Sequence, residues 1–143
     1  MDSLIRLIVD TNVFVSGIIN KNGYPGRILQ AVRSGIVELI TSDAMIDELL
    51  RVLNYPRIRK YSHVNDELIR SVAALLLYQT ERVEPKIHIE LSKDPYDNCF
   101  LEAAVTGKVN ALITGDRSHL LVIEKIHGIP IITARQCVNR FNL

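Results

Sequence analysis

Short apolar runs alternate along the chain with longer segments in which apolar residues recur at helical spacing. The short runs, each of strand length, lie at residues 4–9, 37–40, 80–83, 109–113 and 129–132. The helical spacing fits residues 25–33, 42–53, 64–78 and 94–106, and Thr133 opens a short terminal helix. Residues 57–60 are expected to form a basic linker. Strands that alternate with helices in this way predict an α/β fold with a parallel sheet.

The composition is that of a globular protein with a sizeable core. Of the 143 residues, 48% are hydrophobic and 23% are charged, and we expect one domain over residues 1–143. The formal net charge of +1 excludes a histone-like polyanion binder. The richest apolar stretch, residues 72–78, is far below the roughly 20 residues that span a bilayer. Cys99 and Cys137 lack metal-ligand spacing and nothing marks a signal peptide, which predicts a cytoplasmic protein without a membrane partner.

Acidic residues follow two of the predicted strands. Asp10 comes directly after the first strand, and Asp116 comes shortly after the fourth. Ligands of open parallel sheets bind at the carboxyl ends of the strands, so these two side chains are placed to point into a binding crevice. Glu48 and Asp97 add two carboxylates at the starts of predicted helices. Four carboxylates in one place repel one another unless a cation lies among them, which indicates a hard divalent metal.

The balance of charge gives modest support to a polyanionic substrate. When the four acids are set aside as metal ligands, 12 acidic residues remain against 17 basic ones. A basic cluster beside the Glu48 helix is a candidate RNA-binding surface and fits a solvated face equally well. It consists of Arg51, Arg57, Arg59 and Lys60.

Four short motifs, in order along nearly the whole chain, resemble those of the PIN-domain family. They are Val9-Asp10-Thr11-Asn12-Val13 with Ser16-Gly17, Asp47-Glu48-Leu49 with Arg51-Val52-Leu53, Asp94-Pro95-Tyr96-Asp97-Asn98 leading to Leu101-Glu102-Ala103-Ala104, and Thr114-Gly115-Asp116. Each motif alone is weak, whereas four in order are strong. The chain resembles in particular the single-domain bacterial and archaeal toxins of toxin–antitoxin pairs, the VapC-like ribonucleases. One departure follows the last motif, because Arg117, Ser118 and His119 precede a Leu-Leu pair where the family commonly has two residues.

The resemblance implies both a fold and a chemistry. The fold is a three-layer PIN-like arrangement in which helices flank a central parallel five-stranded sheet of order 3-2-1-4-5. The activity is that of a metal-dependent endoribonuclease that hydrolyses RNA phosphodiester bonds. Bound Mg²⁺ or Mn²⁺ would orient the scissile phosphate, neutralise its charge and lower the pKa of an attacking water. By resemblance, the catalytic and metal-binding residues are Asp10, Glu48, Asp97 and Asp116, with polar support from Thr11, Asn12 and Ser16.

Each of these residues also has a purely structural interpretation. Asp10 and Asn12 readily form turns after strands, Thr114-Gly115-Asp116 fits a plain strand-to-helix turn, and Glu48 fits a solvated surface. Asp94 precedes a proline and is expected to cap its helix, whereas Asp97 is the expected metal-site acid, with complementing the helix dipole as its structural alternative. The histidines show no ligand spacing and are interpreted as surface or loop residues. They are His63, His88, His119 and His127.

Two other functions remain open. A haloacid-dehalogenase-like phosphatase also begins with a strand and an aspartate, but it needs a second aspartate where this chain has Asn12. A non-catalytic PIN module that binds RNA or protein is disfavoured because all four acids are retained. The expected partners are an RNA substrate, a small antitoxin protein and further copies of the chain in a homodimer or higher oligomer. Leu75, Leu76 and Leu77 in succession favour such partners because they cover more than one face of their helix.

Overall fold

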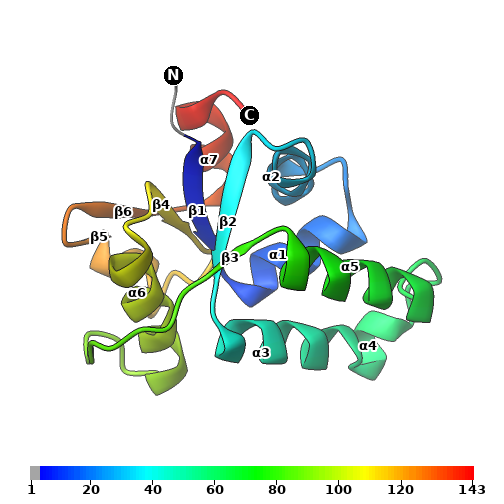
Figure 1. Ribbon diagram of the computed structural model, residues 1–143, viewed down its shortest axis with the longest axis horizontal. Coiled ribbons are helices and arrows are strands. Elements are labelled where there is room, and N and C mark those ends of the chain that lie inside the picture. Colours follow the sequence, from blue (N-terminus) through cyan, green and yellow to red (C-terminus); the bar gives the residue numbers. More distant parts are fainter. Residues whose placement is uncertain (1–3) are drawn as a thin grey trace.

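A six-stranded sheet lies at the centre of the protein in the computed structural model, which describes residues 4–143 (Figure 1). The strands are β1 (Ile5–Val9), β2 (Val37–Thr41), β3 (Glu81–Arg82), β4 (Ala111–Ile113), β5 (Lys125–Ile126) and β6 (Ile129–Ile132). Their order is β3-β2-β1-β4-β6-β5, and all neighbours pair in parallel except β5 and β6. The α/β class and the parallel order 3-2-1-4-5 are confirmed, because β6 is the fifth predicted strand. The antiparallel edge strand β5 was not predicted.

Seven α-helices and one short 3₁₀ helix are present among residues 4–143. They are α1 (Thr11–Ile19), α2 (Tyr24–Arg33), α3 (Asp43–Leu53), α4 (Pro56–Arg59), α5 (Asp66–Tyr78), α6 (Pro95–Gly107), α7 (Ala134–Phe141) and η1 (Leu121–Ile123). The predicted cap of α3 is confirmed, since the Ser42 hydroxyl accepts a hydrogen bond from the Met45 amide over 3.3 Å. Over residues 4–143, none of these helices has the length and apolar composition that crossing a bilayer requires.

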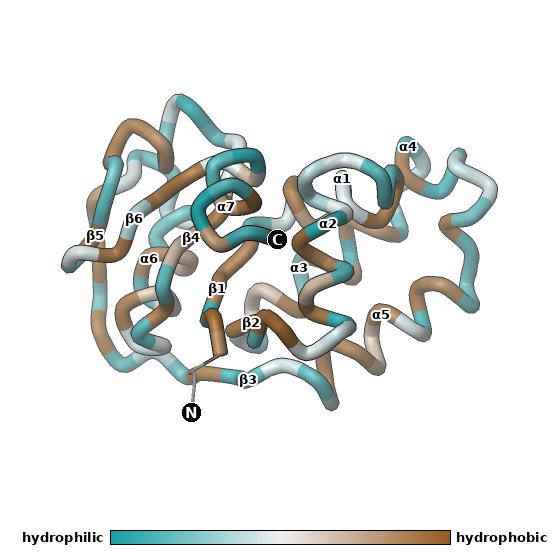
Figure 2. The backbone as a smooth tube through the Cα atoms, turned by 90° about the horizontal axis from the view of Figure 1, so that it is seen from above, coloured by the Kyte–Doolittle hydropathy of each residue, from teal (hydrophilic) through white to brown (hydrophobic). Residues whose placement is uncertain are grey.

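The helices cover the sheet on both faces and form a three-layer arrangement. Successive strand residues point to opposite faces, so β1 places Leu7 and Val9 in one hydrophobic cluster and Ile8 in another. Side chains of α1, α2, α3, α5 and α7 complete the first cluster, and those of α6 complete much of the second. Figure 2 shows hydrophobic colour along much of the central strands and mixed colour along the helices.

Helix α1, directly after β1, is the main element that the sequence pattern missed. Its Val13, Phe14 and Val15 are all buried, so the segment is apolar on several sides and shows no clear 3.6-residue period. β-Branched residues also lower its helix propensity. The predicted basic linker is likewise helical, because Pro56 occupies the first turn of the four-residue helix α4.

Candidate active site

Asp10 links the end of β1 to the start of α1. Its amide donates to the carbonyl of Ile113 over 2.9 Å, which ties β1 to β4. Its carboxylate caps α1 by accepting from the Val13 amide over 2.9 Å, and it also accepts from the Thr114 hydroxyl. The residue is only 6% exposed. Burial raises the pKa of this carboxyl, the hydrogen bonds from Thr114 and Val13 oppose the rise, and the nearby charge of Asp116 adds to it.

Asp116 lies in a tight turn that follows β4. Its Oδ1 accepts hydrogen bonds from the amides of Ser118 and His119, each over 3.0 Å, and Nδ1 of His119 lies 3.3 Å from its Oδ2. The turn after Asp116 thus brings the amides of Ser118 and His119, and the His119 ring, against the carboxylate. Burial alone would raise the pKa of Asp116, but the amide, charge and ring of His119 and the Ser118 amide outweigh burial and lower it.

Asp94 and Asp97 both lie at the start of α6 but in different environments. Asp94 is exposed, and its Oδ1 accepts from the Tyr96 amide over 3.0 Å, which confirms the predicted cap. Asp97 is 8% exposed, and the Ser92 hydroxyl lies 3.4 Å from its Oδ2. Burial first, and then the charges of Asp94 and Asp116, raise the pKa of Asp97 to about 6. In the metal-free protein Asp97 therefore binds a proton far more readily than an ordinary aspartate does.

Glu48 projects from the second turn of α3 towards the start of α1. Its Oε2 accepts from the Thr11 hydroxyl over 2.8 Å, and its Oε1 lies 3.5 Å from a guanidinium nitrogen of Arg51. The hydroxyl oxygen of Tyr96 is buried without a hydrogen-bond partner among residues 4–143. Burial and the neighbouring Glu48 carboxylate raise the pKa of Tyr96. Glu48 is therefore a fixed, partly buried carboxylate and not the solvated residue of the structural interpretation.

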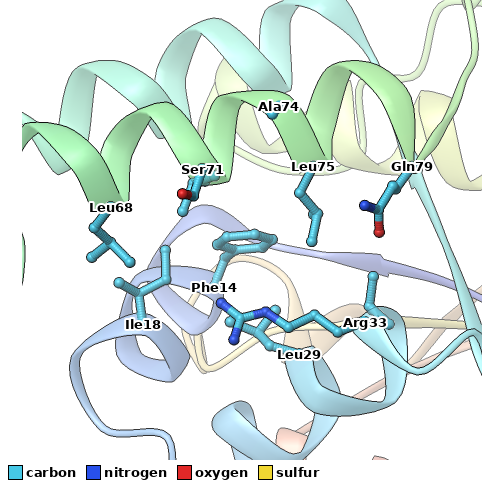
Figure 3. Close-up of a pocket in the computed structure, with 11 residues that line it drawn as sticks. Phe14, Ile18, Leu29, Arg33, Leu68, Ser71, Ala74, Leu75 and Gln79 are labelled. Carbon is cyan, nitrogen blue, oxygen red and sulfur yellow. The ribbon is translucent and has the colours of Figure 1, made fainter.

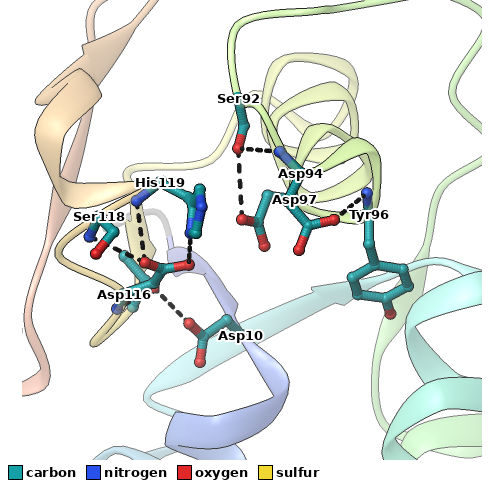
Figure 4. A network of polar contacts seen from close by, with 9 residues as sticks. Asp10, Ser92, Asp94, Tyr96, Asp97, Asp116, Ser118 and His119 are labelled. Carbon is teal, nitrogen blue, oxygen red and sulfur yellow. Dashed lines mark hydrogen bonds and ion pairs between the residues drawn. The ribbon is translucent and has the colours of Figure 1, made fainter.

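One cleft is lined by all four candidate acids. Figure 4 shows three of them, Asp10, Asp97 and Asp116, with their side chains turned towards one another. The cleft has a volume of about 280 Å³, and besides the acids it is lined by Thr11, Asn12, Val52, Tyr55, Arg57, Asp94, Tyr96 and Phe100. Ser16 lines an adjoining hollow of about 310 Å³ that shares Asp10, Asn12 and Asp116 with the cleft. The fold thus brings Asp10, which follows β1, to Asp116, which follows β4, although the two are more than 100 positions apart in the sequence.

The four residues of the basic cluster lie in different surroundings. Arg57 lines the cleft, and its guanidinium carbon lies 5.7 Å from the centre of the Tyr55 ring. Arg51 pairs with Glu48, and Arg59 pairs with Asp66 on α5. Lys60 lies beside the Tyr61 ring and is not among the residues that line the cleft. Within the part of the chain that the structure describes, Arg57 is therefore the one member of the cluster that is both at the cleft and free of an ion pair.

A tighter group within the site consists of Asp97, Asp116 and His119. Each offers one ligand atom, and these atoms lie within 4.8 Å of one another. His119 lies in the turn after β4, as expected of a loop residue, and its side chain is 41% exposed, but nothing in the sequence indicated that this turn returns it to Asp116. Carboxylate oxygens with one imidazole nitrogen form a donor set that suits a divalent cation. Burial is the main cause of the raised pKa of Asp97, the charges of Asp94 and Asp116 add to it, and the charge of His119 opposes it.

We expect Asp97 to contribute more stability to the metal-free protein as the pH falls through about 6, the pKa of its carboxyl in the folded state. The pKa of Asp97 is about 6 in the folded protein and 3.8 for an unperturbed aspartate, so between these values the folded state binds more protons than the unfolded chain. The stability that this group contributes is complete below pH 3.8 and is lost as the pH rises through about 6. Thermal unfolding in EDTA over this range tests the expectation. Asp97→Asn should flatten the profile relative to wild type, whereas exposed Asp47→Asn should leave it unchanged; equal profiles for wild type and Asp97→Asn would refute it.

Comparison with protein families gives a match over most of the chain. A family model of the PIN domain matches residues 6–118. Among curated proteins, the uncharacterized protein MJ1680 of Methanocaldococcus jannaschii is 28% identical over 145 aligned positions, which cover 96% of this chain and 92% of that protein.

Solved structures show the same fold. PAE2754 from Pyrobaculum aerophilum superposes with a TM-score of 0.57 at 16% identity, covering 96% of this chain and 90% of that one. A chain of VapBC2 from Rickettsia felis, solved bound to a DNA fragment from its promoter, gives a TM-score of 0.52 at 13% identity, covering 90% of this chain and 98% of that one.

Proposed function

The chain belongs to the PIN-domain family, whose members are generally nucleases, and on this premise we propose that it is a metal-dependent endoribonuclease. We further propose that residues 1–143 form a single PIN domain. The observation that supports the activity best is the convergence of Asp10, Glu48, Asp97 and Asp116 on one cleft at the carboxyl ends of the central strands.

The side chains of the cleft have different proposed roles in hydrolysis. Asp97 and Asp116, with Asp10 beside them, would hold Mg²⁺ or Mn²⁺ directly or through water. Such a cation supplies charge for the scissile phosphate and acidifies a nearby water. Glu48, held by the Thr11 hydroxyl, orients the attacking water and accepts its proton. We assign the exposed side chain of Asn12, which lines the cleft, to binding a phosphate oxygen.

The substrate class is tested by offering the pure protein matched oligonucleotides with Mn²⁺, Mg²⁺ or EDTA. We expect single-stranded or structured RNA to be cut in the presence of metal. RNA carrying a single 2′-deoxy sugar at the cut position should still be cut, because water and not the 2′-hydroxyl is the nucleophile. Loss of cutting on that substrate would indicate a co-purified ribonuclease of another mechanism, and no cutting of any RNA would leave a binding module as the better description.

Arg57→Ala should weaken RNA binding and flatten its dependence on salt. Arg57 faces the cleft with no ion pair to the described residues, so it is the basic residue best placed to contact a phosphate. Each phosphate contact to a single strand contributes about 0.7 to the slope of log K against log salt, and we expect a loss of that size. Arg59→Ala is the matched control, because Arg59 is paired with Asp66. Equal slopes for wild type and Arg57→Ala, in fluorescence anisotropy titrations, would show that Arg57 does not contact the substrate.

We also propose that the protein is the toxin of a toxin–antitoxin pair and acts in the cytoplasm. The motif resemblance to VapC-like ribonucleases supports this role, and the VapBC2 structure shares the fold. Cys99 and Cys137 are both free thiols, as expected of a protein in a reducing compartment. Expression of the chain alone should arrest growth, and Asp116→Asn should abolish the arrest. Normal growth with active wild-type protein would assign it a housekeeping role.

An apolar groove lies between α5 and the pair formed by α1 and α2 (Figure 3). We expect a second copy of the chain or an antitoxin to bind in this groove. The groove measures about 580 Å³ and is lined by Phe14, Ile18, Leu29, Val32, Arg33, Leu68, Ser71, Val72, Ala74, Leu75 and Gln79. Of the three successive leucines, Leu76 is buried, Leu75 is half-buried in the groove, and Leu77 is 43% exposed.

Light scattering of the pure protein should therefore give at least twice the mass of one chain. Ala74→Glu, which places a charge at the exposed edge of the groove, should lower that mass, whereas Asn139→Glu on the exposed face of α7 should not. A strictly monomeric mass at high concentration, with no co-purifying partner, would contradict the expectation.

A further inference from the structure

His119 is the one histidine of the chain that lies at the cleft acids. His63 contacts the carbonyl of Ile18, and His88 contacts Glu90 and Glu102, both on the exposed surface. His127 is exposed in the turn between β5 and β6. The Nδ1 atom of His119, in contrast, lies 3.3 Å from Oδ2 of Asp116.

The position of the His119 ring is fixed by the backbone on both sides of it. The His119 amide donates to Oδ1 of Asp116 over 3.0 Å, so main chain and ring both face the same carboxylate. The next residue, Leu120, is 1% exposed and anchors the turn in the hydrophobic cluster beneath α6. The turn contains three residues between Asp116 and the Leu-Leu pair, and the third of them is His119. The ring is 41% exposed, and its contacts with Asp116 and the buried Leu120 beside it hold it at the site.

The ring also faces a second acid that comes from a different element. Asp97, in the first turn of α6, offers an oxygen within 4.8 Å of the ligand atoms of both Asp116 and His119. Atoms bound to one cation lie within such distances of each other, because metal–ligand bonds of about 2.0–2.2 Å place opposite ligands about twice that far apart. An imidazole that served only as an ion-pair partner of Asp116 would not need to lie near Asp97 as well.

We propose that His119 is a direct ligand of the divalent cation, together with Asp97 and Asp116, and that its nitrogen makes the site prefer Mn²⁺ to Mg²⁺. The inference rests on the proposed function of the same cleft. Mg²⁺ strongly prefers oxygen ligands, whereas affinities of mixed nitrogen and oxygen sites rise along the transition series that begins with Mn²⁺. Replacing an all-carboxylate set by one that contains imidazole therefore shifts the preference towards the transition metal.

The decisive experiment detects the nitrogen itself, with no need for catalysis. Metal-stripped protein is loaded with Mn²⁺ at less than one equivalent, and pulsed electron paramagnetic resonance records nitrogen hyperfine coupling. We expect coupling in wild type, a change in its pattern when histidine carries the heavy nitrogen isotope, and no coupling in His119→Gln. His63→Gln is the matched control and should retain the coupling.

Calorimetric titration gives the second readout on the same proteins. His119→Gln should lower Mn²⁺ affinity by about 10- to 100-fold, whereas Mg²⁺ affinity should change by no more than about threefold. Circular dichroism melts confirm that the variants are folded, and isotope-labelled wild type shows independently of any variant whether the coupled nitrogen belongs to a histidine.

Two outcomes overturn the inference, and they are distinguishable. If Mn²⁺ binds wild type without nitrogen coupling and Asp116→Asn abolishes that binding, His119 is not a ligand, but the metal site of the proposed nuclease stands. If neither Mn²⁺ nor Mg²⁺ binds wild type at millimolar concentration, the inference and the proposed function both fail.

Discussion

Asp10→Asn should reduce RNA cleavage by about a thousandfold while the protein stays folded. The Asp10 carboxylate would stabilise the transition state by about 4 kcal/mol through the cation, and the loss of this stabilisation corresponds to about a thousandfold lower rate. The side-chain oxygen of asparagine still accepts from the Val13 amide, and its amide group can donate to the Thr114 hydroxyl. Burial disfavours the charged form of Asp10, so the melting temperature of the metal-free variant should be equal to or above that of wild type. Single-turnover cleavage and thermal melts measure the two effects.

Asp47→Asn is the matched control for this substitution. Asp47 is exposed, adjoins Glu48 in the sequence and is not among the residues that line the cleft, so the variant loses the same charge outside the site. Cleavage by Asp47→Asn should stay within about twofold of wild type, because surface substitutions away from a site have small effects. An active Asp10→Asn, or equal losses in both variants, would show that the Asp10 carboxylate has no specific role in catalysis.

The second prediction with a large effect distinguishes the roles of Asp94 and Asp97, which lie three residues apart. Asp97→Asn should lose orders of magnitude in turnover, because it removes a carboxylate that lies within 4.8 Å of the ligand atoms of Asp116 and His119. Its melting temperature should be unchanged or higher in EDTA, since the buried acid has a raised pKa. Asp94→Asn should be nearly silent, because asparagine caps a helix as well as aspartate does and Asp94 is exposed.

Kinetic constants and melting temperatures of this pair decide between a metal ligand and a helix-dipole role for Asp97. If Asp97 only complemented the positive end of α6, Asp97→Asn would cost about 0.3–1 kcal/mol of stability and leave turnover intact. A dead Asp94→Asn with an active Asp97→Asn would show that the third carboxylate of the site has been assigned to the wrong residue.

The strands were predictable from short apolar runs, and most helices from apolar residues that recur about every 3.6 positions. The apolar runs around Ile8 and Leu112 are buried on both faces of the sheet, so they stand out as uninterrupted hydrophobic segments. The Asp94-Pro95 pair marks the start of α6 because proline is tolerated in the first turn and aspartate caps it. These features are local in the sequence, and the structure reproduces them.

The remaining features depend on contacts that no local period records. Helix α1 is enclosed by other elements, so its apolar residues, among them Val13 and Val15, face several directions and give no stripe. The β5 strand has only two residues and exists through its pairing with β6. His119 lacks any ligand spacing to another histidine or cysteine, and its role depends on a turn that bends it back to Asp116. A search for acids and histidines three residues apart after a strand would have found this pair.

Cleavage of end-labelled RNA by one preparation, first in EDTA and then after an excess of Mn²⁺, tests most directly whether the acidic cleft is a metal-dependent nuclease site. Wild type and Asp116→Asn are purified in parallel and assayed under single-turnover conditions with the same RNA. Wild type should be inactive in EDTA and regain activity when Mn²⁺ is added, whereas Asp116→Asn should stay inactive in both states. Undiminished cutting in EDTA, or full activity of Asp116→Asn, would contradict the assignment of this cleft as the site of metal-dependent RNA hydrolysis.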